Sequence, residues 1–108
     1  MIYEERVYEI PNAVRKAFHE RFEKHAMRIM KKYGFEVIGC WDEEIGEMQN
    51  FRYILAWKDL NTRQEAWSKF NTDSEWTQIK IDSAKKHGQL VAKTSNKILK
   101  PTSYSPLK

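Results

Sequence analysis

The clearest structural signal in the sequence is the stretch AVRKAFHERFEKHAMRIMKKYG, residues 13–34. Its apolar positions recur at intervals of three and four, which is the period of an amphipathic helix. The stripe they form consists of Val14, Phe18, Phe22, His25, Ile29 and Tyr33. Gly34 follows where a helix commonly ends in a left-handed residue. The pattern predicts a long helix over residues 13–33 with one face on a sheet.

Strand-like segments lie on both sides of this helix. Residues 2–10 alternate imperfectly in polarity and predict a strand, after which Asn12 is expected to cap the helix. Residues 35–42 and 50–58 predict two strands joined by a hairpin. Both faces of the 50–58 strand are apolar, so we expect both to be covered.

The second half of the chain predicts two further helices and a last strand. The first of these helices is capped by Asp59 or Asn61. The second follows a capping-box sequence, residues 72–75, and ends at Gly88. Residues 89–100 predict the last strand.

The predicted elements follow the order βαββαβ, which indicates a ferredoxin-like α+β fold with a four-stranded antiparallel sheet. The helices of this fold cover one face of the sheet. The other face needs a second layer, and a second copy of the chain is the simplest one. We therefore expect residues 1–108 to form a single domain that associates as a homodimer.

The composition is that of an ordinary globular chain, with 41% hydrophobic and 31% charged residues. No apolar run approaches the ~20 residues that a membrane span requires. The N-terminus lacks the features of a signal peptide. The single cysteine, Cys40, excludes an internal disulfide and is expected to be a small buried residue. These features predict a cytoplasmic protein without a membrane partner.

The formal charge of +4 is unevenly distributed, because residues 80–108 hold seven lysines and one acid, Asp82. The segment has no arginine and no nucleic-acid motif. We therefore interpret it as a solvated surface and expect no nucleic-acid partner.

Several segments along nearly the whole chain occur in the order typical of one family. They are IYEERVY (2–8), EKHA (23–26), GFEVIGCW (34–41), EIG (44–46), WKDL (57–60), DSEW (73–76), ILKP (98–101) and SP (105–106). In these segments the sequence resembles the NIPSNAP family, within the larger group of dimeric α+β barrels. Glu5 departs from the pattern, since the family usually has an apolar residue there.

The resemblance implies a homodimer in which two four-stranded sheets face each other as a barrel, with the helices outside. It implies no established reaction. Some related barrels are cofactor-free oxygenases, isomerases or decarboxylases, and others handle haem.

His25 is the first candidate catalytic residue, because its place on the apolar stripe directs it toward the sheet. A partly buried imidazole is suited to general base catalysis near neutral pH. Arg6 and Tyr8 share one face of the first strand, where they could orient a carboxylate or enolate and stabilise an oxyanion. Alternatively, His25 is a satisfied core residue, and Glu4 and Arg6 form an ion pair beside a packed Tyr8. Which face of this strand meets the helices stays open.

Large aromatic residues supply the candidate ligand-binding set: Trp41, Trp57, Trp76 and Tyr53. They could wall an apolar pocket for an aromatic ligand, or simply belong to the core or an interface. No metal site is predicted, because His19 and His25 are six residues apart and Cys40 has no nearby histidine.

The sequence is compatible with three functions. The first two require no cofactor, and the third requires haem. The first is binding of a small apolar or aromatic molecule in a cleft between helices and sheet, with cofactor-free acid/base chemistry through His25. The second is a non-catalytic dimeric scaffold that binds another protein. The third is a haem-handling protein with His25 as the axial ligand.

Overall fold

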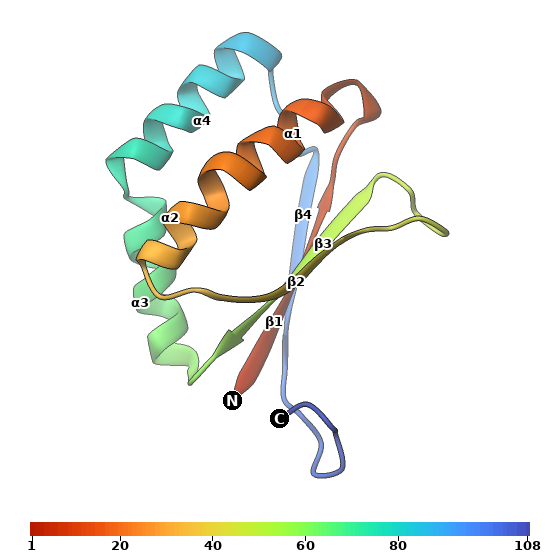
Figure 1. Ribbon diagram of the computed structural model, residues 1–108, viewed down its shortest axis with the longest axis vertical. Helices are drawn as coiled ribbons and strands as arrows, with labels where there is room; N and C mark the ends of the chain where they lie inside the picture. Colours follow the sequence, from red (N-terminus) through yellow and green to blue (C-terminus); the bar gives the residue numbers. More distant parts are fainter.

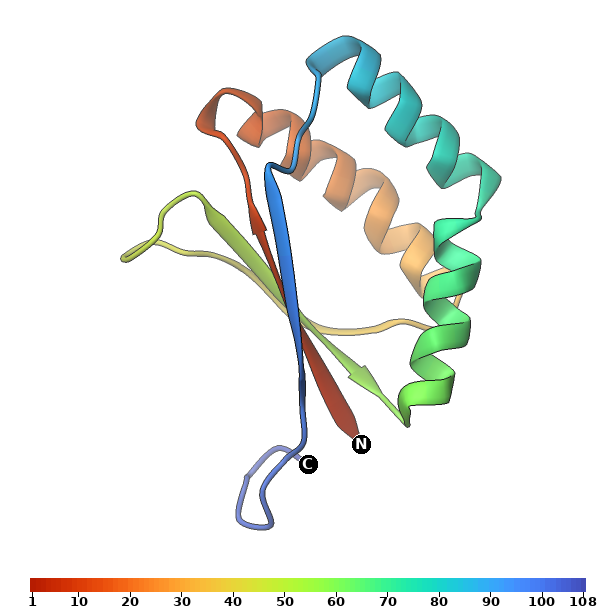
Figure 2. The same ribbon diagram turned by 180° about the vertical axis from the view of Figure 1, so that it is seen from behind.

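The computed structural model describes residues 1–108 and contains one four-stranded antiparallel sheet. Its strands are β1 (Ile2–Glu9), β2 (Glu36–Asp42), β3 (Asn50–Trp57) and β4 (Lys93–Leu99), in the spatial order β2-β3-β1-β4. β1 therefore lies inside the sheet, between β3 and β4 (Figures 1 and 2). The predicted ferredoxin-like α+β fold is confirmed.

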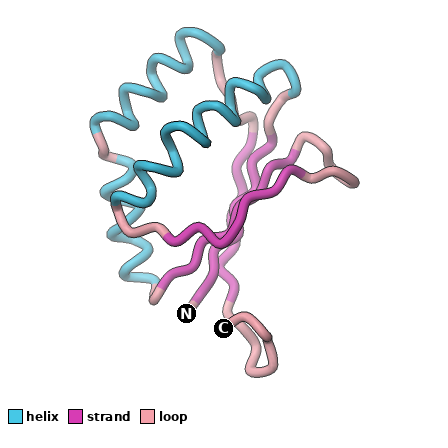
Figure 3. Tube along the Cα trace, viewed as in Figure 1, coloured by secondary structure: helices cyan, strands magenta, loops and turns pink.

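All the helices lie on one side of the sheet (Figure 3). The first helical segment runs from a 3-10 turn, Asn12–Val14, through α1 (Arg15–Arg21) and α2 (Met27–Lys32). α3 (Leu60–Asn71) and α4 (Ser74–His87) follow β3. No helix is both long enough and apolar enough to cross a membrane.

A π-helical turn, Phe22–Ala26, interrupts the first helix between α1 and α2. A π-turn accommodates one more residue than an α-turn. After Phe22, the next residue on the buried face is therefore Ala26, which is 3% exposed, rather than His25. The predicted stripe is correct at Phe18, Phe22 and Ile29, which are buried, and wrong at His25.

The helix ends differ in detail from the predicted ones. Asn12 does not cap the first helix, which follows Pro11 without a side-chain cap. The Asp59 carboxylate caps α3 by accepting a 2.7 Å hydrogen bond from the backbone N–H of Thr62. Asp73, not Thr72, caps α4, and its carboxylate also accepts a 2.5 Å hydrogen bond from the Tyr33 hydroxyl.

The two faces of the sheet have different surroundings. The helix-facing side carries the buried core, in which Phe51, Tyr53, Leu55 and Trp57 of β3 pack against the helices. The opposite side, which we call the open face, carries Ile38, Trp41 and Leu99 with large exposed fractions. In β1 the even-numbered residues share the helix-facing side with this core, because Glu4, Arg6 and Tyr8 are paired with Leu55, Tyr53 and Phe51.

Candidate functional site

A buried carboxylate lies on the helix-facing side of the sheet. Glu4 is 0% exposed, and a charge in such a place must be paired and hydrogen-bonded. Arg63 of α3 donates two hydrogen bonds to it, of 3.0 Å to Oε1 and 2.8 Å to Oε2. Glu4 thus holds α3 on the sheet through a bidentate ion pair.

Three more neutral donors complete the surroundings of this carboxylate. The Trp57 and Trp67 indole N–H groups each donate to Oε1 at 3.0 Å, and the Asn96 amide donates to Oε2 at 2.9 Å. Burial alone would raise the pKa of Glu4, but the hydrogen bonds from Arg63, Trp67 and Asn96 outweigh burial and lower this pKa to about 2. Glu4 is therefore ionised at neutral pH and unsuited to act as a base.

Arg6 connects the Glu4 network to a neighbouring cavity. Its Nη1 lies 3.3 Å from Glu4 Oε2, and its guanidinium stacks on the Trp67 ring at 4.4 Å from the centroid. Burial alone would lower the pKa of Arg6, but the oxygens of Tyr8, Tyr53 and Glu4 raise it above its ordinary value. Arg6 is a permanent cation held in one orientation.

The cavity lies between the sheet and the helices and has a volume of about 190 Å³. Seven aromatic side chains from the sheet and three helical segments line it. They are Tyr8, Phe18, Phe22, Tyr53, Trp67, Phe70 and Trp76. Polar side chains project into it from Arg6, Arg21, Asn71, Lys80 and Thr94. The arrangement suits a small apolar body with a polar end.

Two tyrosine hydroxyls meet Arg6 at the sheet side of the cavity. The Tyr8 and Tyr53 oxygens are 2.7 Å apart, and Arg6 Nε donates to the Tyr8 oxygen at 3.2 Å. Burial raises the pKa of Tyr53 well above its ordinary value. Tyr53 is accordingly protonated at neutral pH.

The predicted site residues fall into separate places. Arg6, Tyr8, Tyr53 and Trp76 come together at the cavity. Trp57 is 1% exposed and donates to Glu4 without lining the cavity. Trp41 is 48% exposed on the open face, so the expectation of one pocket walled by Trp41, Trp57 and Trp76 is wrong.

The expectation that His25 points at the sheet is also wrong. His25 lines a groove between the first helix and α4, where its Nδ1 lies 3.1 Å from Arg28 Nη2. The extra residue of the π-turn brings Ala26 to the buried face in its place. His25 therefore shares no cavity with Arg6 and Tyr8.

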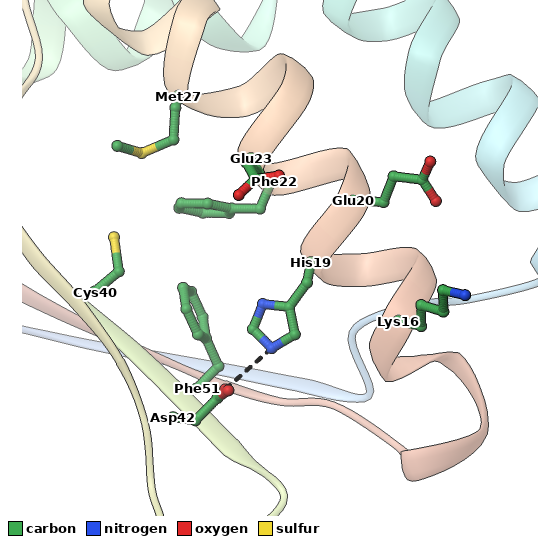
Figure 4. Close-up of a pocket in the computed structure, with 9 residues that line it drawn as sticks. All are labelled: Lys16, His19, Glu20, Phe22, Glu23, Met27, Cys40, Asp42 and Phe51. Atoms are coloured by element: carbon green, nitrogen blue, oxygen red, sulfur yellow. Dashed lines mark hydrogen bonds and ion pairs between the residues drawn. The ribbon is translucent and has the colours of Figure 1, made fainter.

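A second hollow, the outer groove, lies between the first helix and β2 and has a volume of about 630 Å³. Figure 4 shows His19 and Asp42 pointing toward each other across it, with 3.1 Å between Nε2 and Oδ1. Asp42 also pairs with Arg15 at 2.7 Å. Cys40 is exposed here and not buried as expected, and partial burial of its thiol raises its pKa. The groove thus holds a protonated thiol and paired charges, and no activated nucleophile.

Trp67, Arg63 and Arg21 belong to the site although no motif marks them. The helical spacing of Arg63 and Trp67 on one face of α3 was the available signal. Their partner Glu4 is 59 and 63 residues away in the chain. No local pattern connects residues at such separations.

A model of the NIPSNAP family matches residues 3–106. Among solved structures, the chain is similar to protein Atu4242 of Agrobacterium tumefaciens, a NIPSNAP family protein with unknown function, at 29% identity and a TM-score of 0.87 over 100% of both chains. It is also similar to the NIPSNAP family protein Atu5224 of the same organism, at 24% identity and a TM-score of 0.87 over 99% of this chain and 98% of that one.

The fold extends to a more distant protein. SnoaB of Streptomyces nogalater, a cofactor-independent oxygenase, shares 12% identity with a TM-score of 0.65 over 97% of this chain and 96% of its own. The search of curated proteins gives no match.

Proposed function

The chain belongs to the NIPSNAP family, and from this premise we propose that it binds a small apolar or aromatic molecule in the cavity between helices and sheet. The observation that carries the proposal is the junction of Arg6, Tyr8 and Tyr53 at one wall of that cavity. Five further aromatic side chains line the rest of the cavity. A ligand with an apolar body and one oxygen function matches both parts.

In this proposal, Tyr8 is the group that donates a hydrogen bond to the ligand. Its oxygen accepts a hydrogen bond from Arg6 Nε, and in the proposed arrangement it accepts a second from the Tyr53 hydroxyl. A tyrosine oxygen that accepts twice keeps its own proton for a third partner. Tyr53 is suited to donate because burial raises its pKa and keeps it protonated. The Tyr8 proton is then directed to a ligand oxygen.

The same junction supports cofactor-free acid/base chemistry. An enolate or phenolate oxygen that develops negative charge would receive the Tyr8 hydrogen bond beside the fixed charge of Arg6. Donors held in place before the reaction stabilise such an oxyanion without reorganisation. Glu4 and Trp67 position Arg6 for this role. SnoaB, a cofactor-independent oxygenase, has a similar fold, so a fold of this kind is compatible with cofactor-free catalysis.

The proposal favours Tyr8 and Arg6 over His25 as the reactive groups, since His25 lies outside the cavity. The haem alternative loses its expected axial ligand for the same reason. The scaffold alternative requires a cleft filled by the protein's own side chains, whereas this one leaves about 190 Å³.

Phenol binding tests the proposal, because Trp67 and Trp76 line the cavity and an occupant would change their fluorescence. We expect saturable binding to the wild type and roughly fivefold weaker binding to Tyr8→Phe, which loses one hydrogen bond of about 1 kcal/mol. Tyr104→Phe is the matched control, because Tyr104 is 85% exposed in the C-terminal tail. Equal affinity of the wild type and Tyr8→Phe, or no binding at all, would overturn the proposal.

We also propose that the protein is a homodimer formed through the open face of the sheet. The support is an apolar groove of about 420 Å³ on that face, where Trp41, Ile54, Leu99 and Leu107 gather. Apolar surface of this kind is typical of interfaces. The proposed dimer leaves the cavity on the helix side of each copy.

A further inference from the structure

We infer that the ligand of the cavity is an organic anion, a single aromatic or apolar unit that carries a carboxylate; this rests on the proposed function. Three basic side chains line the cavity, Arg6, Arg21 and Lys80, and no aspartate or glutamate does. Bound ligands commonly supply the charge that such a lining lacks.

Arg21 is a cavity residue that has no countercharge. Its guanidinium comes from α1, lies 5.3 Å from the centroid of the Trp76 ring and makes one long hydrogen bond, of 3.4 Å, to the Ser83 hydroxyl. No carboxylate lies within ion-pair distance of it. Burial consequently lowers the pKa of Arg21 from its ordinary value, although the residue stays protonated.

Arg6 adds to this surplus of positive charge. Its partner Glu4 is already engaged by both nitrogens of the Arg63 fork, at 3.0 and 2.8 Å, whereas Arg6 reaches it by a single 3.3 Å contact. The single negative charge of Glu4 is thus shared by two guanidinium groups. One positive charge remains at the sheet side of the cavity, and Arg21 supplies another from the helix side.

The neighbouring hollows differ in charge. The outer groove combines Lys16 with Glu20, Glu23 and Asp42. The groove at His25 shares Arg21 with the cavity and adds Lys24 and Lys86, and it also holds two acids, Glu20 and Asp82. Acids therefore line both grooves, whereas none lines the cavity.

A carboxylate fits this lining better than a neutral oxygen function. The planar guanidinium matches a carboxylate through two parallel hydrogen bonds. Tyr8 offers a further donor, and the rings of Trp67, Trp76 and Phe22 provide apolar walls for the rest of the ligand. The volume of about 190 Å³ limits that remainder to roughly one ring.

Phenylacetate and its neutral isostere phenylacetamide test the inference at neutral pH by tryptophan fluorescence titration of the full chain. We expect the carboxylate to bind the wild type at least tenfold more tightly than the amide. Arg21→Gln should abolish most of this preference. Arg28→Gln removes the same charge from an exposed position of the first helix and should keep the preference.

The possible outcomes distinguish a failure of this inference from a failure of the proposed function on which it rests. Equal affinity of the wild type for the two compounds would overturn the inference and leave the proposed function standing. Binding of neither compound would count against the proposed function itself. A loss of preference in Arg28→Gln equal to that in Arg21→Gln would show a general charge effect and would overturn the role of Arg21. The wild-type comparison stands even if Arg21→Gln folds poorly.

Discussion

The two faces of the sheet differ in what they bury and what they expose. On the helix-facing side, β1 places Glu4, Arg6 and Tyr8 among buried aromatic rings, and every buried polar side chain there has a hydrogen-bond partner. On the open face, Trp41 and Leu99 remain largely exposed. Buried polar groups cost stability unless they are hydrogen-bonded, and contiguous exposed apolar groups commonly mark interaction sites. The difference supports the proposed ligand binding on the inner side and the proposed association on the outer side.

The largest expected effect comes from removing the inner carboxylate. Glu4→Ala leaves Arg63 and two indole N–H groups buried without their acceptor, so we expect a loss of about 3–5 kcal/mol in the free energy of unfolding. Urea denaturation at a fixed protein concentration measures it.

The adjacent residue of the same strand is the matched control. Glu5 points to the opposite side and pairs with Arg52 at 3.5 Å, with 25% of its side chain exposed. Glu5→Ala should therefore cost under about 1 kcal/mol. Similar losses for the two variants would contradict the distinction between the faces.

The open face is tested next by placing a charge in its apolar groove. Trp41→Asp should weaken the proposed dimer at least hundredfold, about 2.7 kcal/mol, because the carboxylate would be buried without a partner. Sedimentation velocity over a range of concentrations measures the dissociation constant. Ile45→Asp is the control, since Ile45 is 93% exposed and lies outside the groove, in the turn between β2 and β3. A monomeric wild type, or equal weakening by Ile45→Asp, would refute the assignment.

The fold could be predicted from the sequence because its signals are local. Periods of two and of three to four, with Gly34 and Gly88 as helix ends, suffice to place four strands and the helices in order. Which side of β1 meets the helices could not be derived in the same way, because both sides carry apolar and polar residues. The register with β3 settles it by pairing Tyr8 with Phe51 and Arg6 with Tyr53.

The candidate site was only half predictable for a related reason. Arg6, Tyr8, Tyr53 and Trp76 were identified because they are chemically distinctive residues on predicted faces. His25 was misplaced because a π-turn shifts the phase of a helix without a sequence pattern that predicts it. The Glu4 network joins four elements, and its geometry depends on how α3 packs on the sheet.

The smallest expected effect is the pH dependence of the inner network. The pKa of Glu4 is about 2 in the folded protein against an ordinary value of 4.5. A lowered folded-state pKa stabilises the protein above the unfolded-state value, and this stabilisation is lost as pH falls from about 4.5 toward 2. We expect Glu4 to contribute a loss on the order of 2 kcal/mol between pH 5 and pH 3.

Glu4→Gln isolates this contribution, because the amide keeps the shape of the side chain and does not titrate. Urea denaturation at several pH values should show a flatter acid limb for Glu4→Gln than for the wild type, whereas Glu5→Gln should leave the slope nearly unchanged. The contrast follows from position: Glu4 is 0% exposed and receives hydrogen bonds from four elements, while Glu5 is partly exposed beside Arg52. Parallel profiles for the wild type and Glu4→Gln would mean that the buried carboxylate gains no more from its donors when folded than from water when unfolded. The inner face would then hold Arg6 by its packing on Trp67 and its hydrogen bond to Tyr8.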